Sequence, residues 1–416
     1  MRKFLVFIVL IQVCFGYETY RNYKVYDMTP TNEQHEALAN WQNEVGVDFW
    51  RFYAPERTSR VMIAPDKQEE FEAFLVQTGI KYEVAIHNME DLIISERQNI
   101  TRNRRGRSSP VQPGFTPDFS VYWTADEMEQ YCTYLAHTYP NLVQIETLLF
   151  SPNNRRIYAL KVSNGVFGQK PIIAMEGGMH AREWASPPTV LYLLHKLVED
   201  SQYRNELLAN VDWLIVPMDN PDGYEHSRLN ARLWRQNRRQ VTPTCVGVDI
   251  NRNFGYSWRT ATVACGSQTY PGPSSLSEPE SFALHTLLER YASRVKLYLS
   301  VHTFGDMVLW PWGYSGSPGW ISTHEEHQAL GVLWRDGILA QGGRNYIVGN
   351  VADVLGNAFG AVDDHMAGHY GIPYVYTLEL TSGFQFQYPE ARIGALAAET
   401  FWGYRAMALH IGEKFS

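Results

Sequence analysis

Short apolar runs alternate with amphipathic segments from about residue 113 to the end of the chain. The apolar runs have the length and composition of buried strands and occupy residues 158–162, 172–175, 211–218, 296–301 and 374–380. Segments with helical signals lie between them, at residues 188–199, 277–294 and 391–414. Thr124-Ala125-Asp126-Glu127 has the spacing of a capping box and predicts the start of another helix. We therefore expect an α/β domain of about 300 residues, built on a mixed, largely parallel twisted sheet covered by helices.

Residues 17–107 carry a different and more compact pattern. Strands are predicted at 47–52, 60–64 and 82–86, with a helix at 68–78. Such alternation within a short segment is typical of a small α+β sandwich. We expect this sandwich to form a separate domain that precedes a larger one at residues 108–416.

An arginine-rich stretch, residues 101–110, ends the first domain. Its composition alone favours a solvated linker. An exposed basic linker is also what a trypsin-like or furin-like protease cuts, so the stretch is a candidate processing site, and the two interpretations are compatible. A glycosylation sequon, Asn99-Ile100-Thr101, lies at its start.

Residues 1–16 have the layout of a secretory signal peptide. Arg2 and Lys3 precede an apolar run from Phe4 to Phe15, which Gly16 follows. The run is too short to span a bilayer, and no later apolar stretch of the sequence is long enough. We therefore predict a secreted protein without membrane contact, in a compartment where disulfides form.

Three cysteines remain beyond the predicted signal. Cys245 and Cys265 lie in a loop-like stretch rich in Gly, Ser and Pro, and we expect them to form a disulfide. Cys132 lies in a predicted amphipathic helix, where a buried and inert thiol is the more common outcome.

Composition argues against one class of partner. The formal net charge is -8 at pH 7, with 36 Lys and Arg against 44 Asp and Glu. Nucleic-acid phosphates are bound by basic surfaces, so a nucleic-acid partner is not expected. The 45% hydrophobic and 19% charged residues are ordinary for a globular protein, which we expect to be a monomer.

The first candidate chemistry lies between a predicted strand and a predicted helix. His180 and Glu183 occupy the turn after the run 171–175, and Ser186 is placed to be the N-cap of the following helix. A histidine and a glutamate three residues apart can bind one zinc ion from such a turn. The spacing is common by chance, and a turn histidine beside a helix-opening glutamate is an equally ordinary outcome.

Two further polar residues lie at the ends of apolar strands. His302 closes the run 296–301, and Glu379 lies inside Val375-Tyr376-Thr377-Leu378-Glu379-Leu380. His302 alone is as well explained by a hydrogen-bonded core histidine, and Glu379 by an edge strand that faces water. In parallel sheets, however, sites lie beyond the carboxyl ends of the strands. The combination of His180, Glu183, His302 and Glu379 therefore indicates a metal site.

Several motifs in the same order resemble those of the funnelin zinc carboxypeptidases, the family of pancreatic carboxypeptidases A and B. They are His180-Ala181-Arg182-Glu183-Trp184, Arg232-Leu233-Trp234-Arg235, Cys245-Val246-Gly247-Val248-Asp249-Ile250-Asn251-Arg252-Asn253, Ser300-Val301-His302, Pro311-Trp312-Gly313-Tyr314 and Thr377-Leu378-Glu379-Leu380. The resemblance covers nearly the whole chain. It implies a secreted zymogen, with an activation segment at 17–107, that hydrolyses the C-terminal peptide bond of proteins and peptides.

The resemblance also implies a role for each matching residue. One Zn²⁺ per chain would be held by His180, Glu183 and His302, with Asp249 supporting His180. Glu379 would be the general base, and Arg235 would stabilise the oxyanion. Asn251 and Arg252 would bind the terminal carboxylate of the substrate, with Arg182 as an outer substrate contact.

The chain departs from the family pattern at two places near the expected cleft. Phe304 follows His302 where the family has a tyrosine two residues after the ligand. Gly356, or Asn357 if no insertion is assumed, takes the place of a mobile tyrosine that closes over the substrate in the family. We expect weaker substrate affinity from this loss rather than an inactive enzyme.

Asp363 determines the expected specificity. Val362-Asp363-Asp364 resembles the segment of carboxypeptidase B in which an aspartate at the pocket floor binds Lys or Arg. We therefore predict a preference for basic C-terminal residues. The bulky apolar walls that Val351, Leu355 and Phe359 would form keep open a preference for hydrophobic or aromatic ends, as in carboxypeptidase A. A zinc-binding pseudoenzyme with the same fold is the alternative from another class, and deacylation by a related zinc site fits the motifs poorly.

Overall fold

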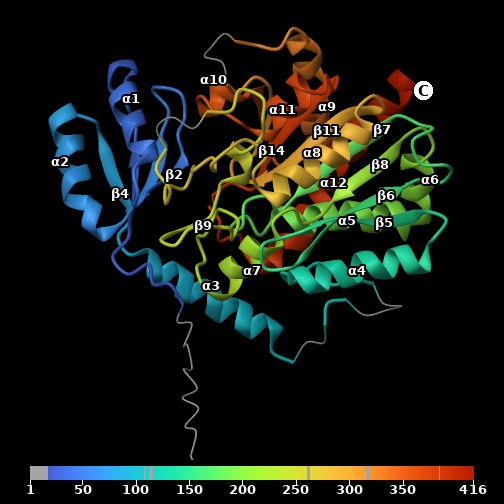
Figure 1. The fold of residues 1–416 in the computed structure, drawn as a ribbon, viewed down its shortest axis with the longest axis horizontal. Helices are drawn as coiled ribbons and strands as arrows, with labels where there is room; N and C mark the ends of the chain where they lie inside the picture. Colours follow the sequence, from blue (N-terminus) through green and yellow to red (C-terminus); the bar gives the residue numbers. More distant parts are fainter. Residues whose placement is uncertain (1–16, 107–108, 112–115, 260–262, 315–318, 384) are drawn as a thin grey trace, which may run out of the picture.

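The computed structural model describes residues 17–416 apart from 107–108, 112–115, 260–262, 315–318 and 384. The predicted signal peptide lies outside the described residues. Two sheets organise the chain, a small one near the N-terminus and a large one in the remainder (Figure 1). The prediction of a small α+β sandwich before an α/β domain is confirmed.

The small sheet has the order β2-β3-β1-β4, with antiparallel pairing throughout. Its strands are β1 (Lys24–Met28), β2 (Val47–Arg51), β3 (Ser59–Ile63) and β4 (Tyr82–Ile86). Helices α1 (Asn32–Ala39) and α2 (Gln68–Thr78) pack on it through Leu38, Phe71 and Leu75. Helix α2 and strand β4 have the predicted bounds, whereas β1 and α1 were not predicted because their five and eight residues carry little periodicity.

A long helix, α3 (Met89–Arg104), joins the two domains (Figure 1). The predicted linker at 101–110 is therefore helical in its first part, which corrects the sequence interpretation. No helix breaker precedes Gly106, so the helix continues into the arginine run. Arg104 contacts the carbonyl oxygen of Tyr122 and lies 3.3 Å from the carboxylate of Glu127 on the larger domain.

The large sheet has eight strands in the order β13-β12-β14-β11-β7-β8-β6-β5. Pairs β8/β7, β7/β11, β11/β14 and β12/β13 are parallel, and the other pairs are antiparallel. The strands are β5 (Val143–Phe150), β6 (Arg156–Val162), β7 (Ile172–Gly177), β8 (Asp212–Val216), β11 (Val295–Thr303), β12 (Met307–Trp310), β13 (Ile347–Asn350) and β14 (Tyr374–Leu380). Strand β14 lies inside the sheet, between β12 and β11, so Glu379 is not on an edge strand.

Helices cover both faces of this sheet. Helices α5, α9 and α12 pack side by side on one face, and α8 lies on the other, in front of the sheet in Figure 1. The helices are α4 (Ala125–Thr138), α5 (Ser186–Val198), α6 (Ser201–Leu207), α7 (Pro221–Leu229), α8 (Pro279–Tyr291), α9 (His324–Leu339), α10 (Val351–Leu355), α11 (Val362–Gly368) and α12 (Ile393–Phe415). None of the helices in the described ranges is long and apolar enough to cross a membrane.

The cysteines are arranged as predicted. Cys245 and Cys265 form a disulfide beside the short hairpin of β9 (Gln240–Thr242) and β10 (Cys245–Val246). Cys132 is fully buried in α4, and burial raises the pKa of its thiol to about 12. A thiol that stays protonated at neutral pH is a poor nucleophile, which agrees with an inert side chain.

The capping box at the start of α4 gives a test of the fold. The Thr124 hydroxyl accepts the N–H of Glu127 at 3.0 Å, and the Glu127 carboxylate accepts the N–H of Thr124 at 2.7 Å. We expect Thr124→Ala to lower the free energy of unfolding by about 1 kcal/mol, because an amide of the first turn loses its acceptor. The measurement is the urea midpoint. The control is Thr133→Ala on the exposed side of the same helix, where alanine favours the helix. Equal midpoints for both variants would contradict the role of the cap.

Candidate active site

His180 lies on a tight turn between β7 and α5. The turn begins with Gly177 and Gly178, and a Cβ on Gly178 would lie 2.9 Å from the sulfur of Met218. Gly178 also has a φ of +71°, a conformation that favours glycine. The absence of a side chain at Gly178 thus permits the backbone to pass close to Met218, and the turn places His180 at the end of the sheet.

Ser186 does not cap α5, contrary to the sequence prediction. The N-cap is Ala185, and Ser186 is the first residue of the helix. The Ser186 hydroxyl accepts the N–H of Gly178 at 3.1 Å and donates to the carbonyl oxygen of Val301 at 2.5 Å. It therefore ties the turn that carries His180 to β11, the strand that carries His302.

The side chains of His180, Glu183 and His302 converge at one point, where they are almost completely buried. The Nδ1 atom of His180 lies 2.7 Å from Oε1 of Glu183 and 3.1 Å from Nδ1 of His302. The Nδ1 atom of His302 lies 3.0 Å from Oε2 of Glu183. Residues 122 positions apart are thus brought together at the carboxyl ends of β7 and β11.

The outward-facing nitrogens of the two histidines indicate where their protons lie. The Nε2 atom of His180 lies 3.3 Å from Oδ1 of Asp249, and Nε2 of His302 lies 2.8 Å from the Ser300 hydroxyl, which donates to Glu176. Protons on both Nε2 atoms satisfy these contacts and leave both Nδ1 lone pairs facing Glu183. Two nitrogen lone pairs and a carboxylate would repel one another unless a cation lies between them. One His-Glu-His set of this kind fits zinc.

Burial and neighbouring charges hold these groups in the forms that bind metals. Burial and the positive charge of Arg235 lower the pKa of His180, which keeps the ring neutral. Burial opposes ionisation of Glu183, but His180 and His302 together lower its pKa below the usual value. Burial likewise opposes ionisation of Asp249, whose pKa is nevertheless lowered by Arg235, at 2.9 Å, and by His180.

Glu379 lies beside this centre on the adjacent strand. Its position in β14 pairs with His302 in β11, and its Oε2 atom is buried without a hydrogen-bond partner among the described residues. Burial raises the pKa of Glu379 well above its usual value, and the negative charge of Glu183 adds to the effect. A cation held by Glu183 would oppose this rise and favour the ionised carboxylate.

Asn251 and Arg252 lie at the other side of the same cavity. The Asn251 N–H donates to Asp249 at 3.1 Å, and its Oδ1 accepts the N–H of Val362 at 2.8 Å, at the start of α11. With Oδ1 occupied in this way, the amide group retains two Nδ2 donors. Together with the guanidinium of Arg252, these donors suit a carboxylate.

Asp363 is buried in the first turn of α11 and lines the same cavity. It accepts the N–H of Asp364 at 2.9 Å and the hydroxyl of Thr377 at 3.1 Å. Burial raises its pKa, and among the described residues it forms no ion pair. The cavity lining therefore includes a carboxyl group that forms no ion pair with the described part of the chain.

The N-terminal domain covers this cavity, which has a volume of about 170 Å³. Residues of β2 line it together with His180, Arg235 and Glu379. Asp48 of β2 forms a bidentate ion pair with Arg182, in which Oδ1 lies 3.0 Å from Nη2. The indole N–H of Trp50 donates to the same carboxylate at 3.0 Å. The predicted outer substrate contact is thus occupied by the N-terminal domain.

The N-terminal domain also contacts the two departures from the family pattern. The Arg51 guanidinium lies 4.5 Å from the centre of the Phe304 ring, a cation–π contact. Gly356 ends α10 with a φ of +77°, and a Cβ there would lie 3.6 Å from the carbonyl oxygen of Phe52. Sequence reasoning missed Asp48 and Arg51 because nothing local distinguishes them from other charged residues of a short strand.

Comparison with known proteins agrees with this geometry. Residues 128–403 match the family model described as "Zinc carboxypeptidase", and residues 26–96 match "Carboxypeptidase activation peptide". The chain is 31% identical to carboxypeptidase B of Helicoverpa zea, over 99% of both chains, and 28% identical to carboxypeptidase A2 of Mus musculus, over 97% of this chain and 98% of that one. Its fold is similar to that of the crystal structure of carboxypeptidase A from Helicoverpa armigera, with a TM-score of 0.88, 30% identity and coverage of 95% of this chain and 99% of that one.

The contact between Asp249 and His180 gives a test of the metal centre. We expect Asp249→Asn to weaken zinc binding by about 10- to 100-fold, because a neutral amide holds and polarises the imidazole less well. Zinc retained after dialysis against graded chelator would be measured by elemental analysis. Asp336→Asn, at an exposed position of α9, is the control. Retention of zinc equal to that of the control would show that Asp249 does not support the centre.

Proposed function

Because the chain belongs to the zinc carboxypeptidase family and carries the activation peptide of that family, we propose that it is a zymogen whose cavity removes basic residues from the C-termini of peptides and proteins. The observation that carries the proposal is the convergence of the side chains of His180, Glu183 and His302. His180 lines one cavity together with Glu379, Asn251 and Arg252. Such a set combines a metal centre, a base and a means of selecting chain ends.

The positions of the residues support the following roles. When bound, the zinc ion supplies Lewis acidity that polarises the scissile carbonyl and acidifies water. Glu379 takes a proton from that water and delivers it to the leaving amine. Arg235 has its guanidinium 3.4 Å from Nδ1 of His180 and stabilises negative charge that develops on the carbonyl oxygen. Asn251 and Arg252 bind the terminal carboxylate, so the bond to be cut is placed by the chain end itself.

The unpaired carboxyl of Asp363 supports the preference for Lys or Arg. A cationic side chain that enters the cavity can pair with Asp363, whereas an aromatic side chain would leave a buried carboxyl without a charged partner. The relatives include proteins named carboxypeptidase B and proteins named carboxypeptidase A2, and their names therefore leave either preference open. Hydrophobic C-terminal residues are the second candidate, favoured by the apolar side chains of Val351 and Leu355 in the cavity lining.

The position of the N-terminal domain supports activation by proteolysis. Residues 47–52 of the N-terminal domain line the cavity of about 170 Å³ and occupy space beside His180 and Glu379 where a substrate would bind. A cut in the basic segment by a trypsin-like or furin-like protease would separate residues 17–107 from an enzyme that starts near Ser108. Residues 107–108 lie outside the described residues, and Arg105 at the end of α3 is exposed. We infer that the protein acts as a monomer outside the cell, where such proteases and disulfides occur.

The specificity is tested with the nicked protein. After limited trypsin treatment, we expect removal of Arg and Lys from matched peptides and little removal of Phe or Leu. Asp363→Ala should lower kcat/KM for Arg by about 100-fold, because loss of one partner of a buried charge pair costs about 3 kcal/mol. Glu379→Gln should retain zinc but lose turnover, which controls for contaminating proteases.

Two outcomes would contradict this proposal in different ways. Cleavage of Phe and Leu peptides but not Arg peptides would refute the role of Asp363 and leave the hydrolytic function in place. Zinc binding without hydrolysis of any of the four peptides would instead indicate a pseudoenzyme.

The ion pair between Asp48 and Arg182 tests the zymogen. We expect Asp48→Ala to raise the activity of the uncut chain on a short blocked peptide by about tenfold or more, because a buried Arg182 without its partner weakens domain docking. Initial rates are measured before any protease is added, and electrophoresis verifies that the chain is intact. The matched control is Asp66→Ala, at an exposed position of the same domain. A rate no higher than that of the control would show that the ion pair does not keep the uncut chain inactive.

A further inference from the structure

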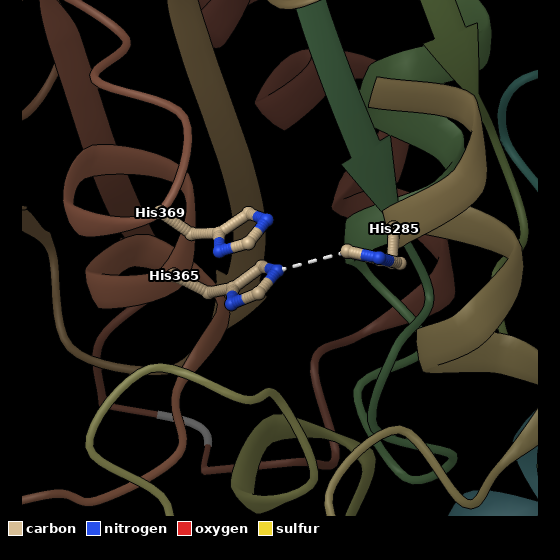
Figure 2. A group of neighbouring side chains, drawn as sticks. All are labelled: His285, His365 and His369. Carbon is tan, nitrogen blue, oxygen red and sulfur yellow. Dashed lines mark hydrogen bonds between the residues drawn. The ribbon is translucent and has the colours of Figure 1, made fainter. Parts of the chain in front are cut away.

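A second cluster of metal-binding side chains lies outside the proposed active site. His285 comes from α8, His365 from α11, and His369 directly follows α11 (Figure 2). One nitrogen from each ring lies within 4.8 Å of a nitrogen from each of the others. His365 is buried, His285 is half-buried and His369 is exposed, so the cluster opens to solvent on one side.

The helical spacing of two of these residues explains why they face the same way. His365 and His369 are four residues apart, and the N–H of His369 donates to the carbonyl oxygen of His365 at 2.9 Å, as in a regular helical turn. Their rings lie one above the other, 4.7 Å apart and 7° from parallel, with the outer nitrogens turned toward His285 (Figure 2). Two histidines four residues apart on one helical face are a recurrent arrangement for binding one metal ion.

One pair of nitrogens already has the separation that a metal requires. The Nδ1 atom of His285 lies 3.2 Å from Nε2 of His365. Two ligands of a tetrahedral zinc ion with bonds of about 2.0–2.1 Å lie about 3.3 Å apart. A rotation of the exposed His369 side chain would bring in the third nitrogen, since its backbone is held by the helix.

The environment keeps the two inner rings in the neutral form that binds metals. Burial lowers the pKa of His365 to about 3, and the neighbouring His369 and His285 add to the effect. Burial also lowers the pKa of His285, again with a contribution from His369. Protons therefore do not compete with a metal for these rings at neutral pH.

Hydrogen bonds orient the rings of both His285 and His365. Metal binding would leave the hydroxyl that bonds to His285 with another acceptor, but it would remove the hydrogen bond to His365. The Tyr370 hydroxyl lies 2.7 Å from Nδ1 of His285 and also 2.7 Å from the His285 carbonyl oxygen, so it can release Nδ1 and keep an acceptor. The Nδ1 atom of His365 accepts the N–H of Tyr256 at 3.2 Å. In the present arrangement the proton of His365 lies on Nε2 and points to Nδ1 of His285 at 3.2 Å. Binding a metal through Nε2 moves this proton to Nδ1, which then faces the N–H of Tyr256 as a second donor, so this contact must open. We therefore expect a weaker site than the His180, Glu183 and His302 centre.

We propose that His285, His365 and His369 form a second metal site, which binds one divalent transition ion of the kind that prefers imidazole, Zn²⁺ or Cu²⁺. Three imidazoles without a carboxylate select these ions over Mg²⁺ or Ca²⁺, which require oxygen ligands. The ion joins α8 to the end of α11. The first turn of α11 carries Asp363 and Asp364, and Asp364 accepts the N–H groups of Gly313 and Tyr314, both at 2.8 Å. Metal binding at one end of the helix thus stabilises the element that forms the cavity floor at the other end.

The test uses the full-length chain without a polyhistidine tag, loaded with one equivalent of zinc. Zn²⁺ or Cu²⁺ is then titrated by calorimetry, and elemental analysis after desalting counts both metals. Electron paramagnetic resonance of the Cu²⁺ sample reports nitrogen ligands. We expect a second ion per chain, a rise in melting temperature with Zn²⁺ or Cu²⁺, and no rise with Mg²⁺.

Three variants separate this site from other histidines. His369→Ala and His285→Ala should lose the second binding event and the rise in melting temperature while they retain the first zinc ion. His137→Ala, at an exposed position of α4, should bind as the wild type does. Since His369 is exposed, its replacement leaves the fold intact, and circular dichroism verifies this. Failure of the wild type to bind a second ion, or an unchanged second ion in His369→Ala, would overturn the proposal.

Discussion

Three buried groups that all present lone pairs face one another at the carboxyl ends of β7 and β11, and this electrostatic constraint organises the larger domain. With the protons of both rings on Nε2, the lone pairs of His180, Glu183 and His302 face one point, and a cation bound there balances them. Their outer partners, Asp249 and Ser300, hold the two rings with the metal-binding nitrogens inward. The parallel strands supply the rigid edge from which these side chains project, and the glycine turn before His180 allows the close approach. The zinc centre is therefore a property of the sheet rather than of one loop.

The activation segment is held by charges that the cavity would otherwise leave unpaired. Arg182 is paired with Asp48, and Arg232 is paired with Glu96 at 2.6 and 3.0 Å while it stacks on Trp184. Both arginines belong to the larger domain and are almost fully buried beneath the smaller one. Because each ion pair joins the N-terminal segment to the larger domain, separation of the two exposes both cations, of which Arg182 lines the cavity. A cavity rimmed with such cations suits substrates that end in a carboxylate.

Helix α11 links the cavity to the histidine cluster. Its first turn places Asp363 at the cavity and Asp364 against the N–H groups of Gly313 and Tyr314, and burial raises the pKa of both carboxyls. His365 within the helix and His369 directly after it face α8. A short helix held at both ends is well suited to fix the shape of a specificity pocket. Asn251 adds a third attachment, because its Oδ1 accepts the N–H of Val362. Its own N–H donates to Asp249, which contacts His180.

Local sequence signals determined most of the architecture and the residues of the candidate metal site. Helix α2 and strands β4 and β14 have the predicted bounds, the capping box of Thr124 forms, and Cys245 pairs with Cys265. His180, Glu183 and His302 could be named from the sequence because the ends of apolar strands are visible in it and because the motifs resemble one known family.

Only the tertiary structure determined which residues from distant parts of the sequence are in contact. Asp48 and Arg182 are 134 positions apart, and only the docked domains show that they pair. Ser186 has the sequence signal of an N-cap, yet its hydroxyl forms hydrogen bonds to Gly178, directly after β7, and to Val301 in β11. The arginine run is joined to the larger domain through Arg104, whose partners Tyr122 and Glu127 are not visible from the run itself. His285 lies 80 positions from His365 and carries no signal that would associate the two. Propensity and periodicity depend on neighbours within one element, whereas ion pairs and metal clusters depend on distances that only the packing of elements sets.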